Sequence, residues 1–225
     1  MPLPWFKMRI GILGGTFNPI HLAHLRIAEE VREACSLDRV LFIPAADPPH
    51  KPVAEEVPFD RRLAMVETAI FDNPAFAVSD LESRRTGKSY SVHTLEILRR
   101  DQPDQELFFI IGMDSFRDIG SWREYRRLFH LAHIVVAARP GIFADDPQAL
   151  LPVAIRGDFC YDVASKTLLH RSGNKVIFLE ETLLDISSTR IRRLAADGRS
   201  IRYLVTPAVE EYISIHGLYR DQKRF

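Results

Sequence analysis

The sequence is poor in cysteine, and its two thiols, Cys35 and Cys160, already exclude two classes of protein. Two cysteines cannot build the disulfide framework of a small secreted domain or a site in which four thiolates hold a metal. So few cysteines are typical of proteins from a reducing compartment. We therefore expect a cytoplasmic protein.

Long hydrophobic runs are also missing. No apolar stretch approaches the ~20 residues that a helix needs to span a bilayer. The first ten residues contain neither a long apolar segment nor a small-residue cleavage pattern, so we expect no signal peptide and no membrane partner. Residues 1–7 are interpreted as an N-terminal extension that precedes the first strand.

A surplus of one charge is absent as well, because 30 Lys and Arg residues balance 30 Asp and Glu residues. Proteins that coat nucleic acid are basic, so we expect no nucleic-acid partner, although a local basic site could still bind a small phosphate ligand. What is present suits a soluble enzyme or binding protein: 225 residues, of which 46% are hydrophobic, can bury a sizeable core.

Apolar runs of strand length alternate with helical patterns along most of the chain. Strands are expected at 8–13, 39–45, 75–80, 106–114, 133–141 and 174–180, and helices at 21–35, 59–71, 89–100 and 121–129. This alternation predicts an α/β fold, a Rossmann-like doubly wound parallel sheet with a small C-terminal helical portion. We expect one domain over 8–219, with a helical subdomain at about 186–219. The irregular stretch 140–174 is the expected place for a lid or a homo-oligomer contact.

The first candidate site is the segment GGTFNPIHLAH, residues 14–24. Gly14 and Gly15 allow the backbone to turn sharply after a strand and to approach a ligand closely. The helix that follows begins near His21, and its first N–H groups are a natural seat for a phosphate. His21 and His24 are three residues apart, which puts both imidazoles on one face of the first turn. We expect a cationic cup that stabilises charge on a phosphate during transfer.

Two other interpretations of the histidine pair remain open at this point. The pair could be half of a zinc site, but no Cys, Asp or Glu lies nearby at ligand spacing, so we expect no protein metal site. It could also merely cap and pack the helix. The segment is not a dinucleotide fingerprint, because its glycines do not follow the G-x-G-x-x-G spacing, and TGKS at 86–89 lacks the first glycine of a P-loop.

The second candidate site is ISSTRIR, residues 186–192. Ser187, Ser188 and Thr189 precede a helical run that carries Arg192. Hydroxyl groups, unpaired N–H groups at a helix start and a fixed guanidinium together make an anion site. Alone, the same residues would equally describe an N-cap followed by solvated arginines.

Together the two motifs resemble the signatures GG(T/S)F(D/N)PxHxGH and ISSTxIR of the nucleotidylyltransferase superfamily, in the same order. The segments PPHK (48–51), GKSYSVHTL (87–95), IIGMDSF (110–116) and ARPG (138–141), with Trp122, are similar to those of one branch, the bacterial nicotinate-nucleotide adenylyltransferases. Ala23 departs from the pattern, because the family usually has glycine between the histidines. We expect activity to survive this change.

The resemblance implies a reaction in which nicotinate mononucleotide attacks the α-phosphorus of ATP in line, giving nicotinate adenine dinucleotide and pyrophosphate. No covalent enzyme intermediate is needed, so catalysis consists of positioning and charge stabilisation. Mg²⁺ is expected on the ATP phosphates, mostly coordinated by water and with few or no protein ligands. Two alternatives remain: a sister enzyme that uses nicotinamide mononucleotide or phosphopantetheine, and a nucleotide-binding regulator without catalysis.

The resemblance also implies roles for individual residues. The catalytic residues would be His21, His24, Lys51 and Arg192. The residues that bind ATP would be Gly14, Gly15, Thr16, Phe17, His24, Gly112, Asp114, Ser187, Ser188, Thr189 and Arg192. Those that bind the mononucleotide would be Asn18, His50, Lys51, Ser91, Trp122 and Arg139. In this scheme Trp122 stacks on the pyridine ring, and Asp114 holds a ribose hydroxyl.

Overall fold

The computed structural model describes residues 7–49, 57–138, 147–180, 182 and 184–220. Three residues with expected roles, His50, Lys51 and Arg139, lie outside the described residues. None of the helices in the described part of the chain is long and apolar enough to cross a membrane.

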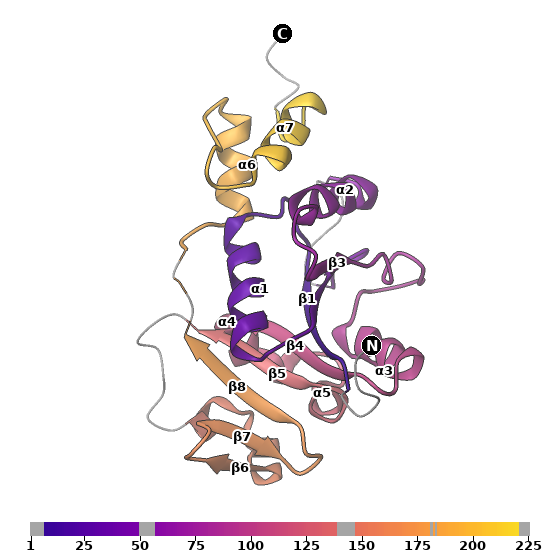
Figure 1. The fold of residues 1–225 in the computed structure, drawn as a ribbon, viewed down its shortest axis with the longest axis vertical. Coiled ribbons are helices and arrows are strands. Elements are labelled where there is room, and N and C mark those ends of the chain that lie inside the picture. Colours follow the sequence, from indigo (N-terminus) through magenta and orange to yellow (C-terminus); the bar gives the residue numbers. More distant parts are fainter. Residues whose placement is uncertain (1–6, 50–56, 139–146, 181, 183, 221–225) are drawn as a thin grey trace.

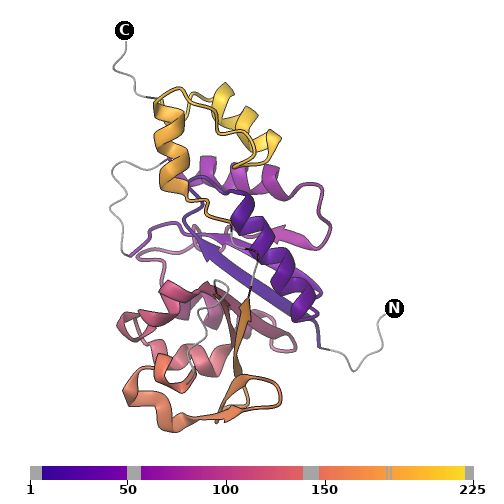
Figure 2. The ribbon, with the colours of Figure 1, turned by 90° about the vertical axis from the view of Figure 1, so that its left-hand side faces the viewer.

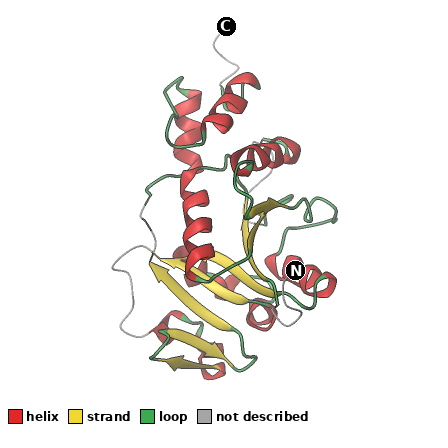
Figure 3. Cartoon of the chain, viewed as in Figure 1, coloured by secondary structure: helices red, strands yellow, loops and turns green. Residues whose placement is uncertain are grey.

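Strands and helices alternate along the chain, as the apolar pattern predicts (Figure 3). The strands are β1 (Arg9–Gly15), β2 (Arg39–Pro44), β3 (Phe76–Val78), β4 (Glu106–Gly112), β5 (His133–Ala138), β6 (Phe159–Asp162), β7 (Thr167–His170) and β8 (Lys175–Glu180). The α-helices are α1 (Leu22–Ala34), α2 (Phe59–Ile70), α3 (Ser91–Asp101), α4 (Met113–Arg117), α5 (Tyr125–Leu131), α6 (Ser188–Ala196) and α7 (Pro207–Ile215).

The strands form a single sheet in the order β3-β2-β1-β4-β5-β8-β7-β6 (Figure 1). From β3 to β8 all neighbours are parallel. From β1 the chain adds β2 and then β3 on one side. It then crosses to the other side of β1 and adds β4, β5 and β8, which is the doubly wound arrangement. The predicted fold class is confirmed. The strands β6 and β7 add an antiparallel extension at one edge, in the stretch that the sequence pattern left irregular.

Both faces of the sheet are buried, and successive residues of each central strand serve different cores. In β4, Phe108 and Ile110 pack in a core with residues of α1, α2 and α7. Phe109 and Ile111 pack in a second core with residues of α3, α4 and α5. A strand that is buried on both faces is an unbroken apolar run, which is why β4 was the clearest strand in the sequence.

The helices α6 and α7 gather at one end of the molecule, beside α2 and the start of α1, while β6 and β7 lie at the other end (Figures 1 and 2). Thr206 caps α7 by accepting a hydrogen bond from the backbone N–H of Val209 at 3.3 Å, as its position before Pro207 predicts. The division into one domain over 8–219 with a subdomain from about 186 stays a prediction. What the contacts show is that the C-terminal helices reach the start of α1.

A buried arginine on α2 ties the ends of two central strands together. The guanidinium of Arg62 donates hydrogen bonds to the carbonyl oxygens of Thr16 at 2.7 Å, Ala45 at 2.8 Å and Val57 at 3.0 Å. Its side chain is only 2% exposed. Thr16 follows β1 and Ala45 follows β2, so the side chain of Arg62 links the ends of these two strands.

We expect Arg62→Met to lower the free energy of unfolding by about 3 kcal/mol. The substitution removes the donor from three partly buried carbonyl oxygens, and leaving a buried acceptor unpaired costs about 1–3 kcal/mol. Urea denaturation measures the effect. The matched control is Arg61→Met, which removes contacts with Tyr212 and His216 nearer the surface and should change stability much less. Equal losses in the two variants would show that Arg62 has no special role.

Candidate active site

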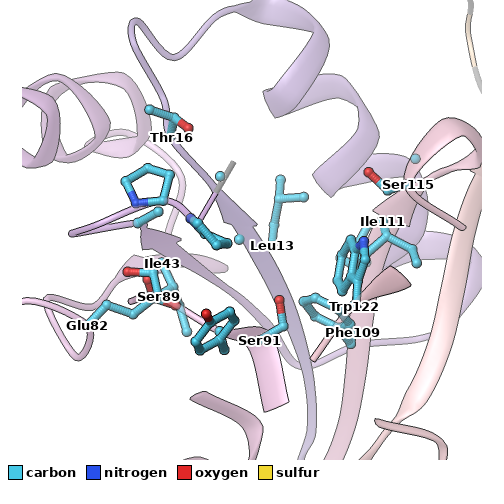
Figure 4. Close-up of a pocket in the computed structure, with 18 of the residues that line it drawn as sticks. Leu13, Thr16, Ile43, Glu82, Ser89, Ser91, Phe109, Ile111, Ser115 and Trp122 are labelled. Carbon is cyan, nitrogen blue, oxygen red and sulfur yellow. The ribbon is translucent and has the colours of Figure 1, made fainter. Parts of the chain in front are cut away.

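A cavity of about 800 Å³ opens at the carboxyl ends of the central strands, where the strand order reverses between β1 and β4 (Figure 4). Ligands of doubly wound sheets bind at this switch point. Of the residues with expected roles, these line the cavity: Gly14, Gly15, Thr16, His24, Ser91, Gly112 and Trp122. Segments that are far apart in the sequence therefore supply its walls.

The glycine turn after β1 needs its small residues for two different reasons. A Cβ on Gly15 would lie 3.1 Å from the ring of Phe17, which is tighter than an ordinary carbon contact. A Cβ on Gly14 would meet only the ring edge of Phe109 at 4.0 Å, so at Gly14 the benefit is open space facing the cavity. The turn therefore leaves its backbone accessible to a ligand, as predicted.

Phe17 packs behind the residues that line the cavity and is not itself one of them. Its backbone has a left-handed φ of 48°, and its side chain is only 1% exposed. The ring packs edge-on against the imidazole of His24, with centroids 5.1 Å apart. Phe17 therefore holds the histidine in place, in addition to any backbone contact with ATP.

The two histidines lie together at the first turn of α1, as their spacing predicts. Their rings are stacked with centroids 3.7 Å apart. The backbone N–H of His21 donates to Nδ1 of His24 at 3.2 Å. Because Nδ1 of His24 accepts this bond, its neutral ring carries the proton on Nε2. His24, which lines the cavity, is therefore prepared to donate a hydrogen bond.

The predicted cationic cup is wrong for the ligand-free protein, because both imidazoles are neutral there. Burial lowers the pKa of His21 to about 4. Burial, and secondarily the charge of His21, hold the pKa of His24 well below its usual value. A bound triphosphate would favour protonation through its negative charge. The pair is thus a set of neutral donors that can gain charge when a phosphate arrives.

The phosphate seat predicted at the start of α1 is partly filled by the protein itself. The N–H of Leu22 donates to the carbonyl of Leu204 at 3.0 Å, and the N–H of His24 donates to the carbonyl of His21 at 2.9 Å. These two amides are not available to a phosphate. Ala23 is buried in this turn and does not line the cavity.

The ISSTRIR motif meets the glycine-histidine motif directly. Arg192 Nη1 donates to the carbonyl of Asn18 at 2.8 Å, and Ser188 Oγ donates to the carbonyl of Pro19 at 2.9 Å. Ser187 caps α6 by accepting from the N–H of Arg190. The start of α6 therefore sits against the turn that leads into the histidines. These residues do not line the cavity itself; they contact Asn18 and Pro19, which lie in the chain between the lining residues Thr16 and His24.

Asn18, expected to bind the mononucleotide, is only 4% exposed and is used inside the protein. Its side-chain oxygen accepts a hydrogen bond from the hydroxyl of Tyr219 at 2.7 Å, and its carbonyl accepts the bond from Arg192. Asn18 is absent from the cavity lining. The structure thus gives it a part in joining the C-terminal segment to the glycine turn.

Beyond β4, the cavity uses the neighbours of Asp114 and not Asp114 itself. Gly112 and Ser115 line the wall, whereas Asp114 is exposed in the first turn of α4 and is not among the lining residues. The motif IIGMDSF therefore reaches the cavity through Gly112 and Ser115, and Ser115 was missed. Hydroxyl residues are common in all sequences, and nothing in the pattern distinguished Ser115.

Trp122 and Ser91, the residues expected at the pyridine ring, both line the cavity, and Trp122 lies near Ile111 and Ser115 in Figure 4. Trp122 is half-buried and packs edge-on against Phe109, with ring centroids 6.3 Å apart. Sequence reasoning missed three neighbours that also line the cavity: Glu82, Tyr90 and Arg123. Glu82 is buried and accepts a hydrogen bond from the hydroxyl of Thr94 at 2.7 Å.

Among the described residues, no cluster of three or more His, Cys, Asp or Glu side chains could hold a metal ion. A divalent cation at this site would therefore have to be held largely by ligand oxygens and water. Mg²⁺ on a triphosphate meets this condition, because it keeps several waters and needs few protein ligands.

Comparison with known proteins assigns the family. The Cytidylyltransferase-like family model matches residues 12–194. A protein of Syntrophotalea carbinolica named probable nicotinate-nucleotide adenylyltransferase is 66% identical over 217 residues, covering 96% of this chain and 100% of the relative. One of the same name from Geobacter metallireducens is 60% identical, covering 96% of this chain and 100% of the relative. The chain belongs to the nicotinate-nucleotide adenylyltransferase family. The predicted nucleotidyltransferase identity is confirmed.

The fold has solved counterparts. The structure of Plasmodium falciparum nicotinic acid mononucleotide adenylyltransferase complexed with NaAD superposes with a TM-score of 0.73, covering 95% of this chain and 98% of that one. Its sequence is 20% identical, so this likeness shows the fold alone. A second structure of the same protein, complexed with APC, gives a TM-score of 0.71 at 19% identity, with coverage of 95% and 98%.

Proposed function

We propose that this member of the adenylyltransferase family transfers the adenylyl group of ATP to nicotinate mononucleotide, a step of NAD biosynthesis. The observation that carries the proposal is the meeting of the two motifs. The hydrogen bonds from Arg192 and Ser188 to the Asn18–Pro19 turn join the start of α6 to the segment whose Thr16 and His24 line a cavity large enough for nucleotides. Identities of 60% and 66% with relatives of that name support the substrate pair.

In the ATP half of the site, the triphosphate lies between the imidazole of His24 and the start of α6. His24 donates from Nε2, and His21 supports it by stacking. Ser187 and Thr189 offer hydroxyl groups to the outer phosphates, Ser188 offers an N–H group at the start of α6, and Arg192 adds a fixed cation. Gly15, Thr16 and Gly112 leave space for the rest of the nucleotide.

In the mononucleotide half, the pyridine ring stacks on Trp122 and its ring substituent faces Ser91 at the start of α3. His50, Lys51 and Arg139 keep their proposed roles at the phosphate of the mononucleotide and at the bridging phosphates. This arrangement brings the attacking phosphate oxygen and the α-phosphorus of ATP together above the glycine turn.

The chemistry is a direct displacement. An oxygen of the mononucleotide phosphate forms a bond to the α-phosphorus of ATP, and the bond from that phosphorus to the bridging oxygen of pyrophosphate breaks. Negative charge grows on the leaving pyrophosphate, where His24, the α6 N–H groups and Arg192 stabilise it. Mg²⁺ bound to ATP would supply further positive charge to the phosphates, held by phosphate oxygens and water with few or no protein ligands.

The buried walls of the cavity matter because they keep bulk water from competing with the mononucleotide. Its lining is mostly apolar, with Leu13, Ile43 and Ile111 among the side chains drawn in Figure 4. Charge–dipole interactions in such a site are stronger than in water. We also propose the cytoplasm as the compartment, which the scarcity of cysteine supports. A homo-oligomer stays an open prediction.

The test is a turnover comparison with ATP and Mg²⁺ and three acceptors: nicotinate mononucleotide, nicotinamide mononucleotide and phosphopantetheine. We expect dinucleotide and pyrophosphate to form fastest, by a wide margin, with nicotinate mononucleotide. Comparable rates with all three would contradict the acceptor assignment. Binding of ATP without any pyrophosphate release would instead favour the non-catalytic regulator.

A further inference from the structure

We propose that Arg123 selects nicotinate over nicotinamide mononucleotide, an inference that rests on the function proposed above. The two substrates differ only in the ring substituent, which is a carboxylate in one and a neutral amide in the other. A site that prefers the carboxylate needs positive charge near the ring. Arg123 follows the stacking residue Trp122 directly in the chain, and both line the cavity.

The charges in the cavity wall are unevenly placed. Among the described residues that line it, Arg123 and Glu82 are the formally charged ones, since burial keeps His24 neutral. Glu82 lies beside Ser89 on one side of the view in Figure 4, and Trp122 lies on the other, with Ser91 between them. Glu82 therefore lies apart from the ring of Trp122 in this view.

Arg123 is held close to the start of α3. Its guanidinium carbon lies 5.3 Å from the ring centroid of Tyr90, a cation–π contact that limits where the side chain can go. Tyr90 is the N-cap residue of α3, and Ser91 is its first residue. A carboxylate placed between this helix start and Arg123 would meet both the positive end of the helix and a guanidinium.

Arg123 has one weak carboxylate partner. Its Nε forms a long ion pair with Glu124 Oε1 at 3.6 Å, which is beyond hydrogen-bond distance. The other oxygen of Glu124 accepts a bond from Arg127 at 2.5 Å, so Arg127 is the main partner of that carboxylate. The side chain of Arg123 is 55% exposed, so a ligand in the cavity can reach its guanidinium.

The backbone next to Arg123 has an unusual conformation for a residue other than glycine. Glu124 has a left-handed φ of 50° and forms the N-cap of α5. The sequence pattern predicted a helix that ran without a break through 121–129, but this turn delays its start to Tyr125. Trp122 and Arg123 consequently stand outside the helix, at the cavity wall, where they can meet a ligand.

The experiment measures kcat and KM with each mononucleotide at saturating ATP, for the wild type, Arg123→Gln, Arg123→Lys and the control Arg126→Gln. Arg126 is an exposed arginine on α5 that does not line the cavity. In Arg123→Gln we expect KM for nicotinate mononucleotide to rise about tenfold, with kcat nearly unchanged, because one charge-assisted contact is lost from ground state and transition state alike. KM for nicotinamide mononucleotide should change less than about twofold.

The quantity that tests the proposal is the preference ratio, which is kcat/KM for nicotinate mononucleotide divided by kcat/KM for nicotinamide mononucleotide. We expect Arg123→Lys to keep part of the preference and Arg126→Gln to keep all of it. An unchanged ratio in Arg123→Gln would overturn the proposal. So would an equal loss for both mononucleotides, which would mean that Arg123 contacts the phosphate that the two share.

Calorimetric binding of each mononucleotide to the same proteins, without ATP, separates this proposal from the proposed function. If the wild type makes no dinucleotide but binds nicotinate mononucleotide more tightly through Arg123, the proposed function fails while the selecting role of Arg123 stands. If the wild type makes the dinucleotide and Arg123→Gln binds both mononucleotides as the wild type does, the proposed function stands and the selecting role of Arg123 fails.

Discussion

His24→Ala should lower kcat about 10²–10³-fold while leaving the fold intact. The neutral imidazole donates from Nε2 into the site because its Nδ1 is occupied by the N–H of His21. Removing one donor that is already oriented toward developing charge costs a factor of about 10²–10³ in turnover. Steady-state pyrophosphate release measures the change, and thermal unfolding checks that the variant is folded.

The matched control is His93→Ala. His93 is also a partly buried histidine in the first turn of a helix, but it pairs with Glu96 and does not line the cavity. Its replacement should leave kcat within about twofold of the wild type, as is usual for substitutions outside a catalytic site. A His24→Ala variant with near-normal kcat would remove His24 from the catalytic set.

Arg192→Met should lower kcat/KM for ATP about 100-fold. Two functions are lost together: a cation for the outer phosphates and the hydrogen bond that ties α6 to the carbonyl of Asn18. The size follows from losing a charge-assisted contact to a phosphate that carries growing charge. Initial rates over a range of ATP concentrations measure it.

Two further variants separate the functions of Arg192. Arg192→Lys keeps the charge but not the planar fork, so we expect a loss of about tenfold. Arg193→Met removes the next arginine, which is exposed on α6, and should have little effect. If Arg193→Met were as damaging as Arg192→Met, the specific bond to Asn18 would not matter and a general basic surface would explain the binding of ATP.

Much of the fold followed from periodicity. The strand β4 and the helix α1 were predicted with boundaries within a few residues, because an apolar run buried on two faces and a long amphipathic pattern are strong local signals. The short strands β6 and β7 were missed. Each has four residues, and most of their stability comes from pairing along the sheet, which leaves little trace in a local pattern.

The candidate site was predictable where a motif fixes the backbone and less so where tertiary contacts decide. The glycine turn, the histidine pair and the meeting of the two motifs agree with the sequence. The neutral state of His21 and His24 could not be predicted, because it depends on burial by other segments. The same is true of Arg62, because a helical pattern alone does not show that this arginine is buried and bonded to the strand ends.

The roles of Asn18 and Arg123 illustrate the same limit at single residues. Asn18 stands in the first motif, yet its side chain is occupied by Tyr219 from the far end of the chain. Arg123 stands among several exposed arginines of a polar segment, and it is set apart by its place in the cavity wall, before the left-handed turn at Glu124. Sequence spacing does not show that Asn18 bonds to Tyr219, about two hundred residues away. It also does not show that the chain turns sharply at Glu124, which is not a glycine.

A crystal structure of the full chain with Mg²⁺ and a non-hydrolysable ATP analogue tests the central claim most directly. We predict that the triphosphate lies between the imidazole of His24 and the first turn of α6, with the guanidinium of Arg192 paired to a phosphate oxygen. A triphosphate bound elsewhere, with His24 and Arg192 both facing solvent, would contradict the account.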